Sequence, residues 1–212
     1  MNTQIWLIRH GETEWNAYGK FQGCKDIPLS SEGILQAKFL KKRFDKSFDS
    51  VYVSPLKRAI ETAKTVCENT GTSPIISNQL REINFGEWEG LTVPQIKSQY
   101  TDQFKIWKTD EIAASLVGGD LSLKNASIRS KKEIMKIAKE NKGKKIIIVA
   151  HGGIIKAGLI GIFDWKMTMY HKLVLGNTAI SKLSFDEDFN PTLVSFNDTN
   201  HLPKDYKIKS YV

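Results

Sequence analysis

Two runs of strand-forming residues, each apolar after its first position, mark the strands that we expect at the centre of the fold. The first covers residues 4–8 and is followed by Arg9 and His10, and the second covers residues 145–150 and is followed directly by His151. A strand buried on both faces of a parallel sheet reads as such a run. Open α/β sheets bind their ligands at the carboxyl ends of such strands. We therefore predict that the two strands are neighbours and that the two histidines meet at one edge of the sheet.

Apolar residues at spacings of three and four predict amphipathic helices between strands. The pattern predicts a helix that begins near Ser30, with the stripe Ile34, Ala37, Leu40 and Phe44; a strand at 51–53; a helix with the stripe Leu56, Ile60, Ala63 and Cys67; a strand at 74–77; helices at about 123–141, directly after His151 and at 165–175; and strands at 177–185 and 192–196. This alternation indicates an α/β fold. We expect a three-layer sandwich whose central sheet is mostly parallel and is flanked by helices.

Length and composition fit one globular domain. The 212 residues are enough for a sizeable core, and the shares of hydrophobic (41%) and charged (25%) residues are ordinary. Residues 93–118 are expected to be partly helical and carry an aromatic stripe. We expect a single domain over 1–212 with a small helical cap insertion at about 92–122.

The net charge is +8, from 31 Lys and Arg residues against 23 Asp and Glu residues. Such an excess indicates nucleic acid in some proteins and an anionic substrate in others. Here the lysines are spread along the chain without interleaved aromatic residues, as on solvated helix faces, so no nucleic-acid partner is expected. No apolar stretch reaches the roughly 18 residues of a membrane span. The first strand begins almost at the N-terminus, so we expect no signal peptide, no membrane partner, a cytoplasmic location, and reduced thiols at Cys24 and Cys67.

Three segments carry further candidate functional residues. Asn16 and Gln22 lie in a long loop expected at 14–29, where they either serve a ligand or make ordinary turns. Arg58 lies in the first turn of a predicted helix, so it either helps that helix end to bind an anion or is exposed at the surface.

The segment at 80–90 is dense in carboxylates, aromatic residues and glycines. One of Glu82, Glu87 and Glu89 is a candidate acid or base, and the other two are expected to be solvated.

Several classes of site are excluded. Neither cysteine has an arginine six residues later, as a cysteine phosphatase requires, and no glycine-rich nucleotide loop is present. Ser54 lacks the Gly-x-Ser-x-Gly setting of a hydrolase nucleophile. No His or Cys spacing supports a zinc site, so neither a metal nor a cofactor is expected.

What remains is two histidines, two arginines and a carboxylate-rich segment. Arginine forks match phosphate oxygens. A neutral imidazole is a nucleophile toward phosphorus, and a carboxylic acid can protonate a leaving alkoxide. The residue types therefore suit phosphoryl transfer through phosphohistidine without a metal.

Short motifs follow one another along nearly the whole chain: residues 9–13 (RHGET), 15–16 (WN), 21–23 (FQG), 26–30 (DIPLS), 54–63 (SPLKRAIETA), 80–82 (LRE), 85–90 (FGEWEG), 149–153 (VAHGG), 177–178 (NT) and 197–202 (NDTNHL). The series resembles the histidine phosphatase superfamily, in its phosphoglycerate mutase-like branch. The resemblance implies that His10 is the phosphorylated nucleophile and that Glu82 donates a proton to the leaving group and then activates water. It also implies a phosphate-binding set of Arg9, Arg58 and His151, with Asn16 and Gln22 contributing.

The distance between two of these motifs favours a phosphatase. Mutases of this family usually carry extra sequence between the general acid and the second histidine, and here only 68 residues separate Glu82 from His151. We expect hydrolysis of a small phosphorylated metabolite. The segment at 82–90 resembles α-ribazole phosphatases and broad-specificity members, which makes α-ribazole 5′-phosphate a candidate substrate. Residues 119–122 (GDLS) depart from the Gly-Glu-Ser that is common there.

Two alternatives stay open. One is a cofactor-dependent phosphoglycerate mutase, and the other is a non-catalytic module that binds phosphorylated ligands. The sequence predicts no oligomeric state.

Overall fold

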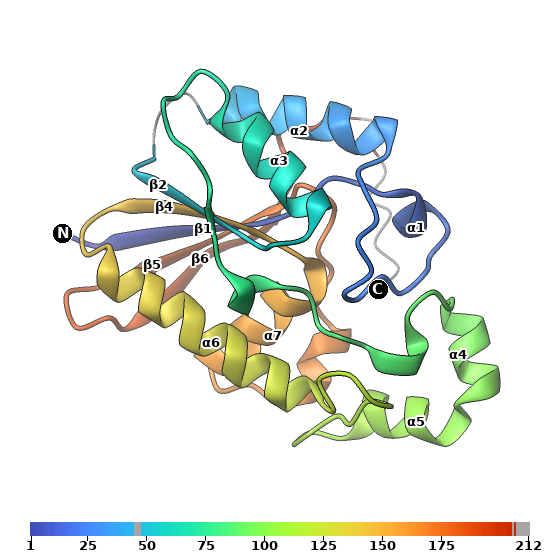
Figure 1. Ribbon diagram of the computed structural model, residues 1–212. Coiled ribbons are helices and arrows are strands. Elements are labelled where there is room, and N and C mark those ends of the chain that lie inside the picture. Colours follow the sequence, from blue (N-terminus) through green and yellow to red (C-terminus); the bar gives the residue numbers. More distant parts are fainter. Residues whose placement is uncertain (45–47, 205, 207–212) are drawn as a thin grey trace.

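The computed structural model describes residues 1–44, 48–204 and 206 (Figure 1). In this part of the chain six strands form one sheet in the order β3-β2-β4-β1-β5-β6. The strands are β1 (Thr3–Arg9), β2 (Ser50–Val53), β3 (Ile75–Ile76), β4 (Lys145–Ala150), β5 (Ile180–Phe185) and β6 (Pro191–Asp198). Neighbouring strands from β3 to β1 pair in parallel, whereas β5 is antiparallel to both β1 and β6. The sheet is mixed and mostly parallel, which confirms the predicted class.

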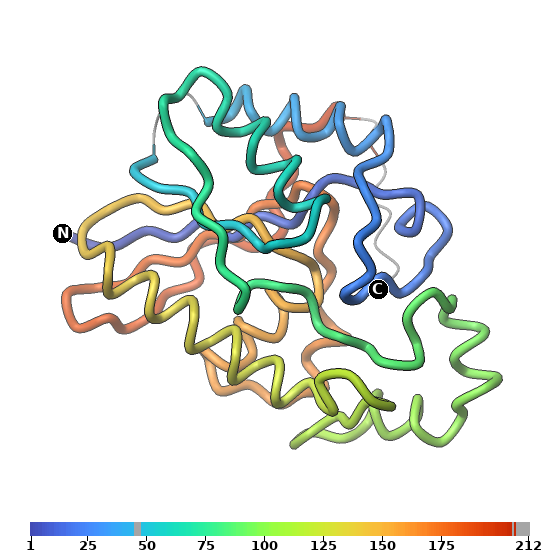
Figure 2. Tube along the Cα trace, viewed as in Figure 1, coloured from blue at the N-terminus to red at the C-terminus, as the bar shows by residue number. Residues whose placement is uncertain are grey.

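Helices cover both faces of this sheet (Figures 1 and 2). On one face α2 (Ser31–Arg43) packs against α3 (Lys57–Cys67), and on the other α6 (Leu123–Glu140) packs against α7 (Gly152–Ile162). The three layers are those expected from the sequence. Among the residues that the structure describes, no helix is both long and apolar enough to cross a membrane.

The apolar run of β4 is continuous because the strand is buried on both faces. Ile146 and Ile148 belong to the core under α6 and α7, whereas Ile147 and Val149 belong to the core under α2 and α3. Alternate side chains of a strand point to opposite faces, and both faces are covered here. β1 pairs with β4 in parallel, and their last residues lie opposite each other. The segments that follow β1 and β4 therefore leave the sheet at the same level.

The expected loop at 14–29 contains one helical turn, α1 (Glu14–Ala17). Thr13 and Asn16 cap this turn reciprocally: the Asn16 amide donates to Thr13 Oγ1 (3.2 Å), and the Thr13 amide donates to Asn16 Oδ1 (3.1 Å). Apolar periodicity needs more than four residues to become visible, so this turn was missed.

The stripe predicted for α2 is partly wrong. Ile34 is 46% exposed, whereas Gly33 and Gln36 are buried. A Cβ atom on Gly33 would lie 2.0 Å from the carbonyl oxygen of Glu12, so the backbone of α2 touches the segment that follows β1. This close approach turns the helix toward that segment, which leads into the candidate site.

Two short helices, α4 (Val93–Gln99) and α5 (Thr101–Thr109), lie within the segment expected to form a cap (Figure 1). Ahead of them come the 3₁₀ turns η1 (Asn78–Leu80) and η2 (Gly86–Trp88). Trp107 of α5 packs edge-on against Trp88 on one side and Tyr170 on the other. Tyr170 lies in a third 3₁₀ helix, η3 (Met167–His171). Aromatic packing thus joins α5 to the rest of the fold.

Candidate active site

His10 and His151 meet at the carboxyl edge of the sheet, as predicted. His10 follows β1 and His151 follows β4, and their ring centroids are 5.1 Å apart. The His10 amide donates to the carbonyl oxygen of Ala150 (2.9 Å), so the strand pairing continues up to the histidines. Both side chains are buried.

The hydrogen bonds of His10 determine which ring nitrogen is free to react. Nδ1 lies 2.6 Å from the carbonyl oxygen of Gly11, which can only accept, so we assign the proton to Nδ1. The lone pair is then on Nε2, which lies 3.3 Å from Nε of Arg58. In this tautomer Nε2 is the nucleophilic atom.

Arg58 is a buried residue of the site, so the surface alternative for this side chain is wrong. Its Nε also lies 3.1 Å from Nδ1 of His151, so a single N–H group faces both imidazoles. The other two guanidinium nitrogens donate to the carbonyl oxygens of Lys25 (2.7 Å) and Gly23 (2.8 Å). The loop before α2 therefore holds the guanidinium in place.

Burial and positive charge keep both histidines neutral. Burial first, and then the charges of Arg58 and Arg9, hold the pKa of His10 well below its ordinary value. Burial and Arg58 do the same to the pKa of His151. Burial also lowers the pKa of Arg58 to about 10, which leaves it charged at neutral pH. The site therefore combines uncharged imidazoles with fixed guanidinium charge.

Ser54 orients His151, a role that the sequence did not suggest. Its Oγ lies 2.6 Å from Nε2 of His151, and since Nδ1 already accepts from Arg58, Nε2 carries the proton and Ser54 accepts it. Ser54 follows β2, the neighbour of β4, and its amide donates to the carbonyl oxygen of Val149. The available signal was a third strand that ends at the same edge of the sheet.

Arg9 crosses the first turn of α7. It is 3% exposed and donates through Nη1 to the carbonyl oxygen of Leu175. A Cβ atom on Gly152 would lie 3.3 Å from Nε and 3.4 Å from Cζ of Arg9. The glycine after His151 thus lets the guanidinium lie flat against the backbone of the helix.

Glu82 sits on the N-terminus of α7. Its Oε1 accepts from the amides of Ile83 (2.8 Å) and Ile154 (2.7 Å), and its Oε2 accepts from the amide of Gly153 (3.0 Å). Oε2 keeps one lone pair for another partner, because it accepts only one of the three bonds.

The two amide residues of the early loop line the same pocket. This pocket is bordered by Arg9, His10, Asn16, Lys20, Gln22, Gly23, Arg58, Glu82, Phe85, Gly152 and Gly153. Asn177 donates to both Asn16 Oδ1 (3.3 Å) and the carbonyl oxygen of His10 (3.1 Å). Oε1 of Gln22 is buried without a hydrogen-bond partner in the described part of the chain. His151 does not border the pocket, and it reaches the site through Arg58.

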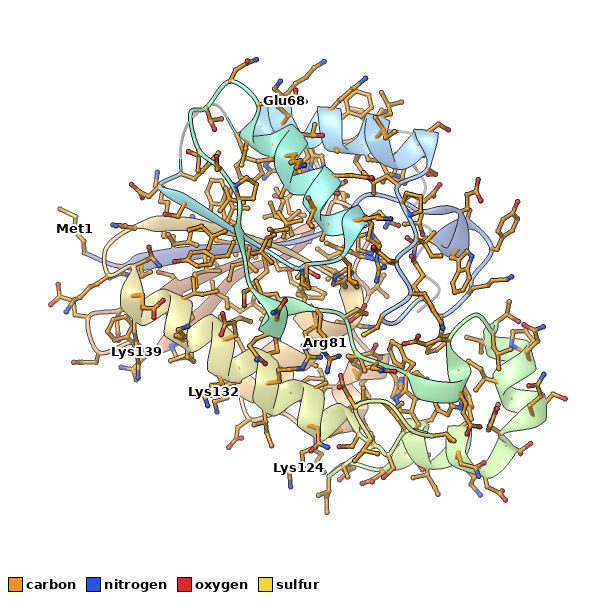
Figure 3. All side chains as sticks on the ribbon, viewed as in Figure 1. Met1, Glu68, Arg81, Lys124, Lys132 and Lys139 are labelled. Carbon is orange, nitrogen blue, oxygen red and sulfur yellow. The ribbon has the colours of Figure 1, made fainter. Side chains whose placement is uncertain are left out.

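An ion cluster anchors the segment that carries Glu82. Asp120 pairs with Arg81 (Oδ1 to Nη2, 2.6 Å) and with Arg129 of α6 (Oδ2 to Nη2, 2.9 Å). Both arginines also donate to the carbonyl oxygen of Glu82, at 3.1 and 3.3 Å. Arg81 lies on this segment alongside α6 (Figure 3). Asp120 stands in the stretch that departs from Gly-Glu-Ser, and its work here is to fix the position of Glu82.

The remaining carboxylates of this segment lie outside the pocket lining. Glu87 is exposed and accepts from the Tyr100 hydroxyl (3.0 Å), and Glu89 accepts from the amides of Cys24 (2.9 Å) and Phe85 (3.2 Å). No group of three or more His, Cys, Asp or Glu side chains in residues 1–44, 48–204 and 206 is arranged to hold a metal ion.

A family model for the histidine phosphatase superfamily (branch 1) matches residues 5–199, which include every element of this site. The chain belongs to this superfamily. Its sequence resemblance is thereby confirmed over nearly the whole length.

This histidine phosphatase superfamily member is similar to solved structures of phosphatases. A phosphoserine phosphatase from Entamoeba histolytica, in complex with 3-phosphoglyceric acid, has a TM-score of 0.89 and 37% identity, over 95% of this chain and 100% of that one. An alpha-ribazole-5′-P phosphatase from Escherichia coli, designated putative, has a TM-score of 0.81 and 27% identity, over 93% and 97%. Phosphoserine phosphatase 1 of Hydrogenobacter thermophilus is 28% identical over 94% of both chains. These relatives support a phosphatase.

Proposed function

We propose that this chain hydrolyses a small phosphorylated metabolite through a phosphohistidine on His10. One observation carries the proposal: His10, whose Nε2 holds the lone pair, lines one pocket together with Arg9, Arg58 and Glu82. A phosphate in this pocket meets a nucleophile, fixed positive charge and a proton donor together.

In the first step, Nε2 of His10 attacks phosphorus and the P–O bond to the substrate breaks. The Glu82 carboxyl, protonated for this step, gives its proton to the leaving oxygen, which departs as an alcohol. The guanidinium groups of Arg9 and Arg58 stabilise the charge that develops on the phosphoryl oxygens. The Nδ1–H group of His10 keeps its hydrogen bond to the Gly11 carbonyl oxygen, and this bond stabilises the positive charge of the phosphorylated ring.

In the second step, water attacks phosphorus while the Glu82 carboxylate takes one of its protons. The N–P bond breaks, its electron pair returns to Nε2, and inorganic phosphate leaves. Histidine and carboxylic acid are restored, and the net reaction is one ester and one water converted to one alcohol and one phosphate. The guanidinium groups provide the positive charge that a metal ion provides in metal-dependent phosphatases. We therefore propose a metal-independent reaction.

The choice of phosphatase over mutase rests on access to the site. Between Glu82 and His151 the cap consists of two short helices, α4 and α5, so we propose one domain over 1–212 with a small cap at about 92–122 that leaves the phosphoenzyme open to water. Phosphoserine and α-ribazole 5′-phosphate are the first substrates to test, because phosphatases with those names are similar to this chain. We further propose a cytoplasmic location.

The test is phosphate release in EDTA from p-nitrophenyl phosphate, phosphoserine, α-ribazole 5′-phosphate and 3-phosphoglycerate. Wild type should turn over at least one ester, and His10→Ala should lose more than 10³-fold in kcat while circular dichroism remains unchanged. Retained turnover in His10→Ala, or a loss in EDTA that a divalent ion restores, would contradict the proposal.

Glu82→Gln provides the complementary test. With p-nitrophenyl phosphate, whose leaving group needs little help, it should accumulate an alkali-stable phosphoenzyme, because the water step lacks its base. Glu133→Gln is the matched control, since Glu133 is equally buried but bonds to Ser77 outside the pocket. Mutase activity that requires a bisphosphate primer would favour the alternative enzyme, and phosphate binding without turnover would favour a binding module.

A further inference from the structure

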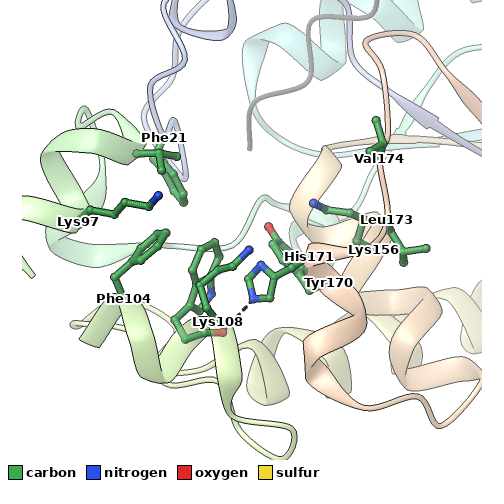
Figure 4. A pocket seen from close by; sticks show the side chains of 11 residues that line it. Phe21, Lys97, Phe104, Lys108, Lys156, Tyr170, His171, Leu173 and Val174 are labelled. Atoms are coloured by element: carbon green, nitrogen blue, oxygen red, sulfur yellow. Dashed lines mark hydrogen bonds between the residues drawn. The ribbon is translucent and has the colours of Figure 1, made fainter. Parts of the chain in front are cut away.

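A second, larger pocket adjoins the candidate active site. It holds about 350 Å³ of space between α4 and α5 on one side and Lys156 of α7 with η3 on the other (Figure 4). Its lining is continuous with that of the first pocket along the chain: Phe21 borders the large pocket, and Lys20 and Gln22 border the small one. A space of this size suits the non-phosphate part of a small metabolite.

Positive charge lines this pocket without a matching acid. Its eleven lining residues include Lys97, Lys108 and Lys156, and none of the eleven is acidic. The ammonium groups of Lys97 and Lys156 point toward each other across the space (Figure 4). Lys97 and Lys108 are exposed at the rim, whereas Lys156 is 5% exposed.

Lys156 is an unusual residue in its helix. It is the single charged side chain of α7, whose other ten residues are all apolar or glycine, and nine of those ten are buried. Within the described residues no carboxylate pairs with it and no group accepts a hydrogen bond from it, and its ammonium lies 3.9 Å from the ring centroid of Tyr170. Buried charges are normally paired, so an unpaired one next to a pocket points to a ligand of opposite charge.

Tyr170 supplies a second unpartnered donor beside the reaction centre. Its hydroxyl is buried without a hydrogen-bond partner among the described residues. A Cβ atom on Gly153 would lie 3.0 Å from this hydroxyl and 2.7 Å from Oε1 of Glu82. The phenol and the proposed proton donor are therefore close neighbours across Gly153, and Tyr170 lines the large pocket while Glu82 lines the small one.

We propose that this pocket binds the carboxylate of a phosphorylated carboxylic acid, with the ammonium of Lys156 and the hydroxyl of Tyr170 as its two donors. The inference rests on the proposed function and names its substrate class. A carboxylate has one negative charge and two oxygens, which matches one buried cation and one buried hydroxyl. α-Ribazole 5′-phosphate carries no carboxylate and is expected to be a poor substrate.

The test compares esters that differ only in the carboxylate. Phosphoserine is paired with phosphoethanolamine, and 3-phosphoglycerate with glycerol 3-phosphate. Wild type should prefer each carboxylated member by at least tenfold in kcat/KM. In Lys156→Met this ratio should fall to about one, chiefly through KM. Lys132→Met, which changes an exposed lysine on the outer side of α6 (Figure 3), should keep the wild-type ratio.

If Lys156 only stabilised the fold, Lys156→Met would lower Tm. A binding role predicts a rise in Tm instead. Burial lowers the pKa of Lys156 to about 7, so the lysine opposes folding at neutral pH. Lys156→Met should therefore raise Tm by several degrees while it lowers the substrate ratio. A fall in Tm with an unchanged ratio would overturn the inference, as would a wild-type ratio near one or a preference for bisphosphates over carboxylates.

Binding measurements separate a failure of the carboxylate inference from a failure of the proposed hydrolase function. Calorimetry with His10→Ala measures the affinity for phosphoserine and phosphoethanolamine without turnover. A tenfold preference for phosphoserine that Lys156→Met removes supports the carboxylate site even if wild type hydrolyses no ester. Equal affinities overturn it even if p-nitrophenyl phosphate is hydrolysed.

Discussion

Asp120 and Arg81 form a two-point ion pair, with 2.6 Å between Oδ1 and Nη2 and 3.2 Å between Oδ2 and Nη1. The pair lies directly behind Glu82, whose carbonyl oxygen accepts from Arg81. Burial alone would raise the pKa of Asp120, but the Arg81 bond, the Asn84 amide and the charge of Arg129 lower it overall. Asp120 is therefore a charged anchor for the segment that carries the proposed acid.

Asp120→Asn should lower kcat about tenfold and leave KM for p-nitrophenyl phosphate within a factor of two, because it shifts Glu82 without touching the phosphate. It should also cost about 1–3 kcal/mol of unfolding free energy, since two guanidinium groups lose their counter-charge. Steady-state kinetics and urea titration measure both effects. The control is Asp188→Asn, an exposed carboxylate far along the chain, which should change neither. An unchanged kcat in Asp120→Asn would contradict the anchoring role.

Ser54→Ala should reduce kcat/KM about tenfold. The substitution leaves the buried Nε2–H of His151 without its acceptor, so the imidazole is free to turn away from Arg58. Inhibition by inorganic phosphate should weaken in parallel, because His151 acts on the phosphate through that arginine. The matched control is Ser127→Ala, a serine of α6 that is also buried and lies against Gly161 of α7. Equal kinetics for the two variants would show that Ser54 does not orient His151.

The meeting of His10 and His151 was predictable because it depends on local information. Each apolar run fixes a buried strand, each histidine follows its run, and neighbouring parallel strands bring their ends together. The helix at 123–141 was equally clear, since α6 is long enough for its periodicity to show. The two last strands were found, although β5 begins three residues later than expected, at Ile180.

Other features depend on contacts that one segment cannot reveal. The exposure of Ile34 follows from the contact of Gly33 with another segment, and the burial of Arg58 follows from carbonyl groups of the loop before α2. The role of Asp120 needs Arg81 and Arg129, which come together only in the fold. Lys156 did leave a signal, a lone charge within an apolar helix, but nothing in the sequence says that a pocket lies beside it.

The preference for carboxylated substrates should depend on pH. Lys156 loses its charge as pH rises through about 7, so the ratio of kcat/KM for phosphoserine to that for phosphoethanolamine should fall between pH 6 and pH 8. The groups that face this lysine are Arg9, Glu82, Lys97, Lys108, Tyr170 and His171. Tyr170, with a pKa well above its ordinary value, and His171, with a pKa of about 4, stay neutral over this range. Taking the ratio cancels the titration of the phosphate itself. A ratio that rises with pH would contradict the assignment.

All four histidines should make the fold sensitive to mild acid. Burial is the first cause that lowers each pKa: His10 and His151 lie well below the ordinary value, and His171 and His201 lie at about 4. Below pH 6.5 the unfolded chain therefore binds protons that the folded chain does not, and stability is lost as pH falls from about 6.5 toward 4. Each histidine contributes up to about 1.4 kcal/mol per pH unit in this window.

Urea titrations at half-unit steps from pH 7 to pH 4.5 measure this slope. His201→Asn should reduce this slope by the equivalent of about one proton, because it removes one histidine whose pKa burial lowers. His201 suits the test because it lies outside the two pocket linings of the site, and its hydrogen bond is to Thr178. Turnover behaves differently: His10 stays neutral and nucleophilic at pH values where an ordinary histidine is protonated. We therefore expect kcat/KM for p-nitrophenyl phosphate to persist at pH 5.5 while the unfolding free energy is already falling. A parallel decline of both quantities from pH 6.5 would mean that His10 takes up its proton in the folded state, contrary to the burial and guanidinium charge around it.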